Sequence, residues 1–171
     1  MKITLVRPAP EHQAAATAFR QAFFDAGETV INGSELLDQT ESYDDWLKAV
    51  TDNTNTETVN PEWVVTDTFF AFDAEEKLIG IIDFRHELKG FLVDFGHCGY
   101  SVRPDERCKG YATEMLRLLL EYAKKCGFES LQLSVERKNA PSVRTIVKNG
   151  GTYERSFAFE GETADVYRII L

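Results

Sequence analysis

The most strongly periodic part of the chain, residues 110–126, constrains the fold more than any other feature. Apolar residues recur along it at helical spacing, and Gly127 follows as a C-terminal stop. Strand-forming runs flank it at residues 91–102 and 131–135. Gly96 and Gly99 interrupt the first run, as a bulge or the close approach of a ligand would require. A strand, a helix and a second strand make a crossover unit, so we expect the two strands to form a parallel pair in one sheet.

The rest of the chain predicts further helices and strands without a dividing linker. Helices are expected at residues 11–26, 40–50 and 139–149, and strands at 3–6, 64–72, 78–85, 152–159 and 164–170. Residues 51–61 are rich in Asn and Thr and are expected to form a loop, the candidate lid. We therefore expect one domain over residues 1–171, of class α+β, with a mixed, mostly antiparallel central sheet of about six to seven strands flanked by helices.

The composition weighs against several classes of function. No stretch approaches the roughly 20 apolar residues that span a bilayer, and the N-terminus lacks a signal-peptide pattern, so we expect no membrane role and a cytoplasmic location. A formal net charge of −9 opposes binding to nucleic acid and favours a cationic or amine-bearing partner. The cysteines and histidines are too scattered to predict a disulfide framework or a metal site: Cys98, Cys108, Cys126, His12, His86 and His97.

The turn that leads into the helix at residues 110–126 is the candidate ligand site. The first N–H groups of a helix have no partners inside it, and the helix dipole makes this end partly positive. Gly110 lacks a side chain and allows close approach of a phosphate, while Arg107 and Lys109 add positive charge. These features predict an anion site, although a glycine at a helix start often binds nothing. Neither a P-loop nor a Gly-x-Gly-x-x-Gly motif occurs in the chain.

Three motifs, in the right order, resemble those of the GNAT acetyltransferases. Residues 107–112, Arg-Cys-Lys-Gly-Tyr-Ala, are similar to the Arg/Gln-x-x-Gly-x-Gly/Ala signature whose backbone amides wrap the coenzyme A pyrophosphate. Residues 99–104 resemble the splayed strand that precedes this signature and holds the pantetheine arm. Residues 139–144 and 148–151 resemble the family's Asn-x-x-Ser helix and its terminal glycine. Residues 84–86 and 96–104 further resemble a bacterial branch of predicted acetyltransferases, and that likeness implies no substrate.

The resemblance implies the GNAT fold, acetyl-CoA as cosubstrate, no metal, and acetyl transfer to a primary amine that attacks the thioester directly. The acceptor would be an amine-bearing small molecule, peptide or protein, and a homodimer is compatible with the family. The residues implied in binding the cofactor are Tyr100, Ser101, Val102, Arg107, Cys108, Lys109, Gly110, Tyr111, Ala112, Thr113, Asn139 and Ser142.

The group that protonates the departing thiolate is less clear from the resemblance. Many relatives use a tyrosine on the helix after Asn139, but the matching residue here is Val147. We hypothesise that Ser142 takes this role, as suggested for a branch that modifies ribosomal proteins. The alternative is a hydroxyl that only caps the helix. Tyr153 is a second candidate hydroxyl.

The general base is also missing from its usual place. The carboxylate that some relatives carry on the strand before Asn139 would fall at Ser134. We hypothesise that His97 substitutes for it, because imidazole titrates in the useful range. The alternative is a hydrogen-bonded histidine of the sheet. Other carboxylates, or ordered water alone, also remain open: Glu87, Asp94 and Glu136.

The absence of the usual acid and base, at Val147 and Ser134, supports a second interpretation: a noncatalytic acyl-CoA-binding or regulatory domain that keeps the pyrophosphate turn. A third is an α+β domain with an accidental anion turn. The three motifs in order weigh against the third interpretation, and thiol release with a panel of amines would separate the first two.

Overall fold

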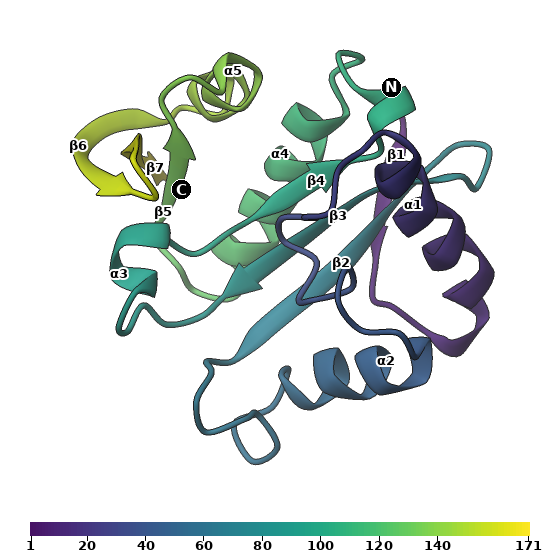
Figure 1. Cartoon of the computed structure of the whole chain (residues 1–171). Helices are drawn as coiled ribbons and strands as arrows, with labels where there is room; N and C mark the ends of the chain where they lie inside the picture. The colour runs from purple at the N-terminus through teal and green to yellow at the C-terminus, as the bar shows by residue number, and fades with distance from the viewer.

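A computed structural model describes residues 1–171, and its strands form two antiparallel sheets (Figure 1). The first sheet has the order β1-β2-β3-β4, with bounds Ile3–Val6, Thr66–Asp73, Leu78–Arg85 and Tyr100–Val102. The second has the order β5-β7-β6, with bounds Ser130–Glu136, Glu162–Ile170 and Thr152–Phe159. The structure confirms the α+β class and the number of strands.

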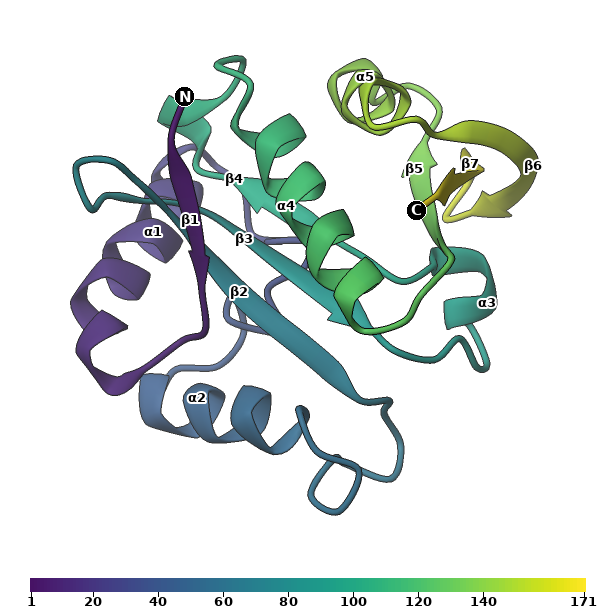
Figure 2. The same ribbon diagram turned by 180° about the vertical axis from the view of Figure 1, so that it is seen from behind.

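The helices cover both faces of the first sheet. They are α1 (Gln13–Asp25), α2 (Tyr43–Asp52), α3 (Leu92–Phe95), α4 (Tyr111–Lys125) and α5 (Ala140–Lys148), with short 3-10 turns η1 (Pro10–His12) and η2 (Pro104–Glu106). Helices α1 and α2 lie on one face and α4 lies on the other, while α5 stands beside the second sheet (Figures 1 and 2). None of these helices has the length and apolar character needed to cross a membrane.

Alternation along β2 buries the strand on both sides. Phe69 belongs to the core under α4, in the same cluster as Met115. Phe70 points the other way and stacks on Trp46 of α2, with ring centroids 5.5 Å apart. Because successive side chains of a strand point to opposite faces, one run of aromatic residues fills two cores.

The prediction of a long strand at residues 91–102 is wrong. Only its end forms β4, and its start forms the short helix α3. Gly96 explains the break. Its φ of 86° is positive, so the backbone leaves the extended conformation here, and residues with a side chain rarely adopt such an angle. A Cβ at Gly96 would also lie 2.4 Å from the carbonyl oxygen of Gln132, so the backbone approaches β5 too closely for any side chain.

The expected parallel pair is wrong as well. Strands β4 and β5 share no ladder, and the only bridge on that side of β5 joins Gly96 to Leu133. Side chains satisfy this edge of β5 instead: the Ser134 hydroxyl donates to the carbonyl of Phe95, and His97 Nδ1 accepts the N–H of Gln132. The two sheets therefore separate beyond this point, and β4 keeps a free edge.

Candidate active site

A cavity of about 510 Å³ lies between β4, the start of α4 and α5. All but one of the residues predicted to bind the cofactor line it. These are Tyr100, Ser101, Val102, Arg107, Cys108, Gly110, Tyr111, Ala112, Thr113, Asn139 and Ser142. The exception is Lys109, whose ammonium pairs at 2.7 Å with Glu106, a residue that itself lines the cleft. The structure thus brings three separate motifs of the sequence to one cleft.

The turn before α4 presents a row of free backbone donors to this cleft. The N–H groups of residues 107–113 have no acceptor in the protein, and Gly110, the N-cap of α4, offers no side-chain cap. Two residues of the turn adopt left-handed conformations, Cys108 with φ 62° and Gly110 with φ 89°. Successive N–H groups in such a turn converge on an anion, and the helix dipole adds to the effect. The residues therefore fit a pyrophosphate.

The two cations predicted to assist are engaged with carboxylates. Arg107 binds Glu28 in a two-pronged pair, with N–O distances of 2.7 and 2.8 Å, and its Nε donates to the carbonyl of Val102 at 3.2 Å. The hydrogen bond from Arg107 lowers the pKa of Glu28. Glu28 also lines the cleft. A phosphate that uses Arg107 must therefore compete with Glu28 for it.

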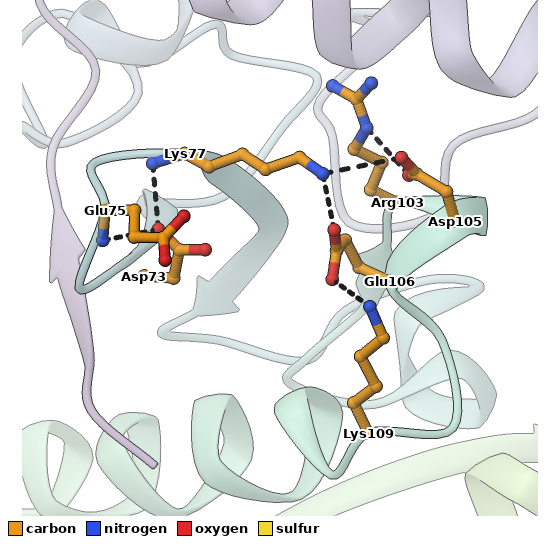
Figure 3. A network of polar contacts seen from close by, with 7 residues as sticks. All are labelled: Asp73, Glu75, Lys77, Arg103, Asp105, Glu106 and Lys109. Carbon is orange, nitrogen blue, oxygen red and sulfur yellow. Dashed lines mark hydrogen bonds and ion pairs between the residues drawn. The ribbon is translucent and has the colours of Figure 1, made fainter.

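A chain of ion pairs anchors the turn to the β2–β3 hairpin (Figure 3). Lys77 of the hairpin pairs with Glu106, which also pairs with Lys109 at 2.7 Å. Arg103 pairs with Asp105 at 2.7 Å, and Lys77 reaches Asp105 at 3.4 Å. Asp105 and Lys109 are about half-exposed, so their pairs add little stability, whereas Glu106 is 12% exposed. The network connects residues 103–109 to the hairpin through side chains.

Ser142 lies at the cleft with a hydroxyl that caps nothing. Asn139 is the N-cap of α5, and its side chain accepts the N–H of Ser142 at 3.3 Å. The phenol of Tyr100 lies 3.5 Å from the carbonyl of Ser142, and burial raises the pKa of Tyr100 to about 12. Tyr153 lies elsewhere: it is 55% exposed on β6, with its hydroxyl 2.7 Å from that of Ser156.

The structure does not bring His97 to this cleft. Its Nδ1 accepts the N–H of Gln132 at 3.0 Å, and its ring packs edge-on against Phe128. Burial lowers the pKa of His97 to about 4. This geometry matches the alternative given above, a hydrogen-bonded histidine of the sheet.

The other carboxylates considered for the base also lie outside the cleft. Asp94 of α3 pairs with Arg155 at 2.6 Å, Glu136 is half-exposed beside Lys138, and Glu87 is exposed in a loop. None of the three lines a cavity described here.

A second cavity, of about 900 Å³, lies on the α1 and α2 face of the first sheet. Its wall includes part of the predicted loop at residues 51–61 and the segment 30–36 that follows α1. Val30 and Asn32 line both cavities, so the segment forms a partition between them.

Three charged side chains lie together in the second cavity. Asp83 is 1% exposed; it accepts the N–H of Gly99 at 2.6 Å and a guanidinium N–H of Arg85 at 2.9 Å. Arg85 also donates to the carbonyl of Gly96 at 2.9 Å. Burial, followed by the charge of Asp83, raises the pKa of Glu35 well above its usual range. Such a perturbed carboxyl in a cavity is a candidate functional group.

This cluster was not predicted from the sequence, although the positions of Asp83 and Arg85 in the sequence are unusual. Asp83 and Arg85 interrupt an otherwise apolar strand, and charged residues at buried strand positions are unusual. Glu35 carries no such signal, because it belongs to a polar loop.

Sequence comparison finds a known family over most of the chain. The model for the acetyltransferase (GNAT) domain matches residues 2–152. Comparison with curated proteins gives no match.

Solved structures share the arrangement of elements at low identity. A protein from Bordetella pertussis described as a GNAT-family acetyltransferase is 16% identical, with a TM-score of 0.69 over 98% of this chain and 95% of its own. RimL, a ribosomal L7/L12 alpha-N-protein acetyltransferase solved with coenzyme A, is 13% identical, with a TM-score of 0.71 over 100% and 95%. A dodecameric spermidine N-acetyltransferase from Vibrio cholerae is 16% identical, with a TM-score of 0.67 over 98% and 93%. At these identities the likeness shows the fold.

Proposed function

The chain belongs to the GNAT acetyltransferase family, and from this premise we propose that it transfers the acetyl group of acetyl-CoA to a primary amine by direct attack on the thioester. The observation that carries the proposal is the row of free N–H groups at residues 107–113, placed at the cleft without a side-chain cap. Acetyl-CoA supplies the activated acetyl group when bound.

The turn and the free edge of β4 have separate tasks in this proposal. The N–H groups of residues 107–113 bind the pyrophosphate, and Gly110 leaves the space for it. Tyr100, Ser101 and Val102 line the cleft along β4 and hold the pantetheine arm with backbone groups. Asn139 fixes the start of α5 across the cleft from β4.

Ser142 donates the proton to the departing thiolate in the proposed reaction. Its position at the cleft supports this role, and so does its hydroxyl, which does not cap α5 and lies next to the phenol of Tyr100. Tyr100 is the nearest rival hydroxyl; burial raises its pKa to about 12, which reduces the advantage that a phenol has over an alcohol as an acid.

The acceptor is proposed to be an amine on a small molecule, peptide or protein. The net charge of −9 favours a cationic acceptor over an acidic one. The structural neighbours named for spermidine and for a ribosomal protein act on amines of two of these kinds. A homodimer stays a prediction.

The rival function is a binding domain that holds acyl-CoA without turnover. Thiol release from acetyl-CoA, measured with a panel of amines, separates the two. The enzyme releases coenzyme A in repeated turnovers with at least one amine, whereas a binding domain binds acetyl-CoA and releases none. Absence of turnover with every amine, in protein that binds acetyl-CoA, would contradict the proposed activity.

A further inference from the structure

The charged side chains that line the cofactor cleft differ in whether they are paired. They are Glu28, Glu106, Arg107, Arg144 and Lys148. Arg107 is held by Glu28, and Glu106 is held by two lysines outside the lining. Arg144 and Lys148 are exposed on α5 and pair with no carboxylate. The unpaired positive side chains of the cleft therefore both belong to α5.

The sequence of α5 places these two cations on one face of the helix. Residues 144 and 148 are four apart, so their side chains are neighbours about 6 Å apart along the axis. Like charges at this spacing slightly destabilise a helix, and α5 contains no Asp or Glu to offset them. Lys148 lies in the last turn, where the helix dipole favours a cation, but Arg144 does not. Helix stability therefore does not explain Arg144.

Contacts at the two ends of α5 define the direction in which the cleft runs. Near its start, the phenol of Tyr100 on β4 lies 3.5 Å from the carbonyl of Ser142. After its last residue, Asn149 Nδ2 donates to the carbonyl of Thr113, in the first turn of α4, at 3.2 Å. A molecule with its pantetheine on β4 and its pyrophosphate at the turn therefore passes α5 from start to end. The part beyond the pyrophosphate then lies toward the end that carries the two cations.

That part of coenzyme A carries a third phosphate, on the 3′ position of the ribose. A phosphate monoester has nearly two negative charges at pH 7, and arginine and lysine are its usual partners in proteins. The backbone donors of residues 107–113 are assigned to the pyrophosphate, and Arg107 is engaged with Glu28. Arg144 and Lys148 are the cations of the cleft that remain free for the third phosphate.

We propose that Arg144 and Lys148 bind the 3′-phosphate, so that the protein selects coenzyme A over 3′-dephospho-coenzyme A, which lacks this group. The inference rests on the proposed function, because it assigns a further part of the same cofactor. Backbone donors at the turn cannot supply this selectivity, since the pyrophosphate is common to both molecules.

The test titrates coenzyme A and 3′-dephospho-coenzyme A calorimetrically into the full-length protein at low salt. It compares the wild type with the double variant Arg144→Gln/Lys148→Gln. The matched control is Lys124→Gln/Lys125→Gln, which removes two exposed lysines from the last turn of α4, outside the cleft. Both double variants change the net charge equally, so a difference between them reports the position of the charges.

The wild type and the control should bind coenzyme A about tenfold more tightly than the dephospho form, a gain typical of two exposed charge pairs. Arg144→Gln/Lys148→Gln should bind the two molecules with nearly equal affinity. The preference of the wild type should also shrink at high salt, because salt screens exposed charges.

Two results would overturn the inference and leave the proposed function standing. One is a wild type that binds both molecules equally well. The other is a double variant that loses the same affinity for both, which would place the two cations at the pyrophosphate. A wild type that binds neither molecule would overturn the inference and the proposed function together.

Phosphorus NMR of bound coenzyme A gives a second readout, which needs no variant. Cations beside the 3′-phosphate favour its dianion, so its second pKa, about 6 when free, should fall on binding to the wild type. An unchanged pKa of the 3′-phosphate in the complex would also overturn the inference.

Discussion

The two cavities on either side of residues 30–36 are built from different parts of the chain. The cofactor cleft uses backbone N–H groups from one contiguous turn, whose directions follow from the local angles of Cys108 and Gly110. The second cavity uses side chains that come from distant positions, among them Glu35, Trp63 and Asp83. A site made of backbone groups can therefore be predicted from a short sequence motif, whereas a site made of side chains depends on the whole fold.

The charged side chains of the two regions differ in their exposure to solvent. The Arg107–Glu28 pair at the cleft is about two-fifths exposed on both sides, so water and salt weaken it. Asp83 and Arg85 in the second cavity are 1% and 13% exposed. We therefore expect changes at the cleft to alter binding, and changes in the cavity to alter protonation and stability as well.

The largest expected effect concerns the pH dependence of stability. The pKa of Glu35 is raised in the folded protein, so its contribution to stability is complete below the unfolded pKa and is lost as pH rises toward the folded pKa. Glu35→Gln removes this loss. The difference in unfolding free energy, Glu35→Gln minus wild type, should therefore rise by up to about 1.4 kcal/mol for each pH unit above about 4.3.

Denaturant unfolding at pH 5, 6, 7 and 8 measures this difference. Glu62→Gln is the control and should follow the wild type throughout. Parallel curves for Glu35→Gln and wild type would show that the cavity does not perturb Glu35, and the contrast between the two regions would lose its basis.

The next effect tests the partition itself. Gly33→Ala places a Cβ against the carbonyl of Gly99 at a residue with φ 72°, so both a clash and backbone strain oppose it. Gly161→Ala is the matched control, because φ is 78° and no atom lies within 4 Å of the added Cβ. We expect losses in unfolding free energy of about 3 kcal/mol for Gly33→Ala and about 1 kcal/mol for Gly161→Ala. Equal losses would mean that residues 30–36 are not fixed on β4.

A smaller effect separates catalysis from binding at the cleft. Ser142→Ala should lower turnover by about thirtyfold while acetyl-CoA affinity changes by less than about threefold. Tyr100→Phe, at the rival hydroxyl, should have the smaller effect on turnover. Steady-state and calorimetric measurements on both variants decide between them, and unchanged turnover in Ser142→Ala would remove this residue from the mechanism.

The smallest effect concerns competition for Arg107. Glu28→Gln frees the guanidinium, so acetyl-CoA affinity should rise by roughly threefold at low salt and by less at high salt. Titration at two ionic strengths checks this, and a fall in affinity would show that Glu28 supports the turn instead of competing for it.

The sequence predicted the cleft far better than the rest of the molecule. The helix at residues 110–126 and its motif were found because the spacing of apolar residues and of Gly110 is local information. The strand predicted at residues 91–102 failed because its apolar start resembles a strand, and the break depends on the close approach of Gly96 to Gln132. His97 could not be placed by pattern either, since its role depends on which backbone group its ring meets.

The expected parallel pair failed for a related reason. The pattern of strand, helix and strand does not show that β4 and β5 separate, because side chains of Ser134 and His97 occupy the edge where the ladder would continue. That separation leaves the free edge of β4 and creates the cleft. Glu35 and its partners were missed because no segment of the sequence contains them together.

The central claim is that free backbone donors at the start of α4 bind acetyl-CoA, and calorimetric titration tests it most directly. Gly110→Glu places a negative side chain among these donors, and Gly127→Glu is the matched control at the other end of α4, with a similar φ of 91° and open space. We predict micromolar binding by the wild type and by Gly127→Glu, and none by a folded Gly110→Glu. Absence of binding to the wild type, or equal binding by both variants, would contradict the account.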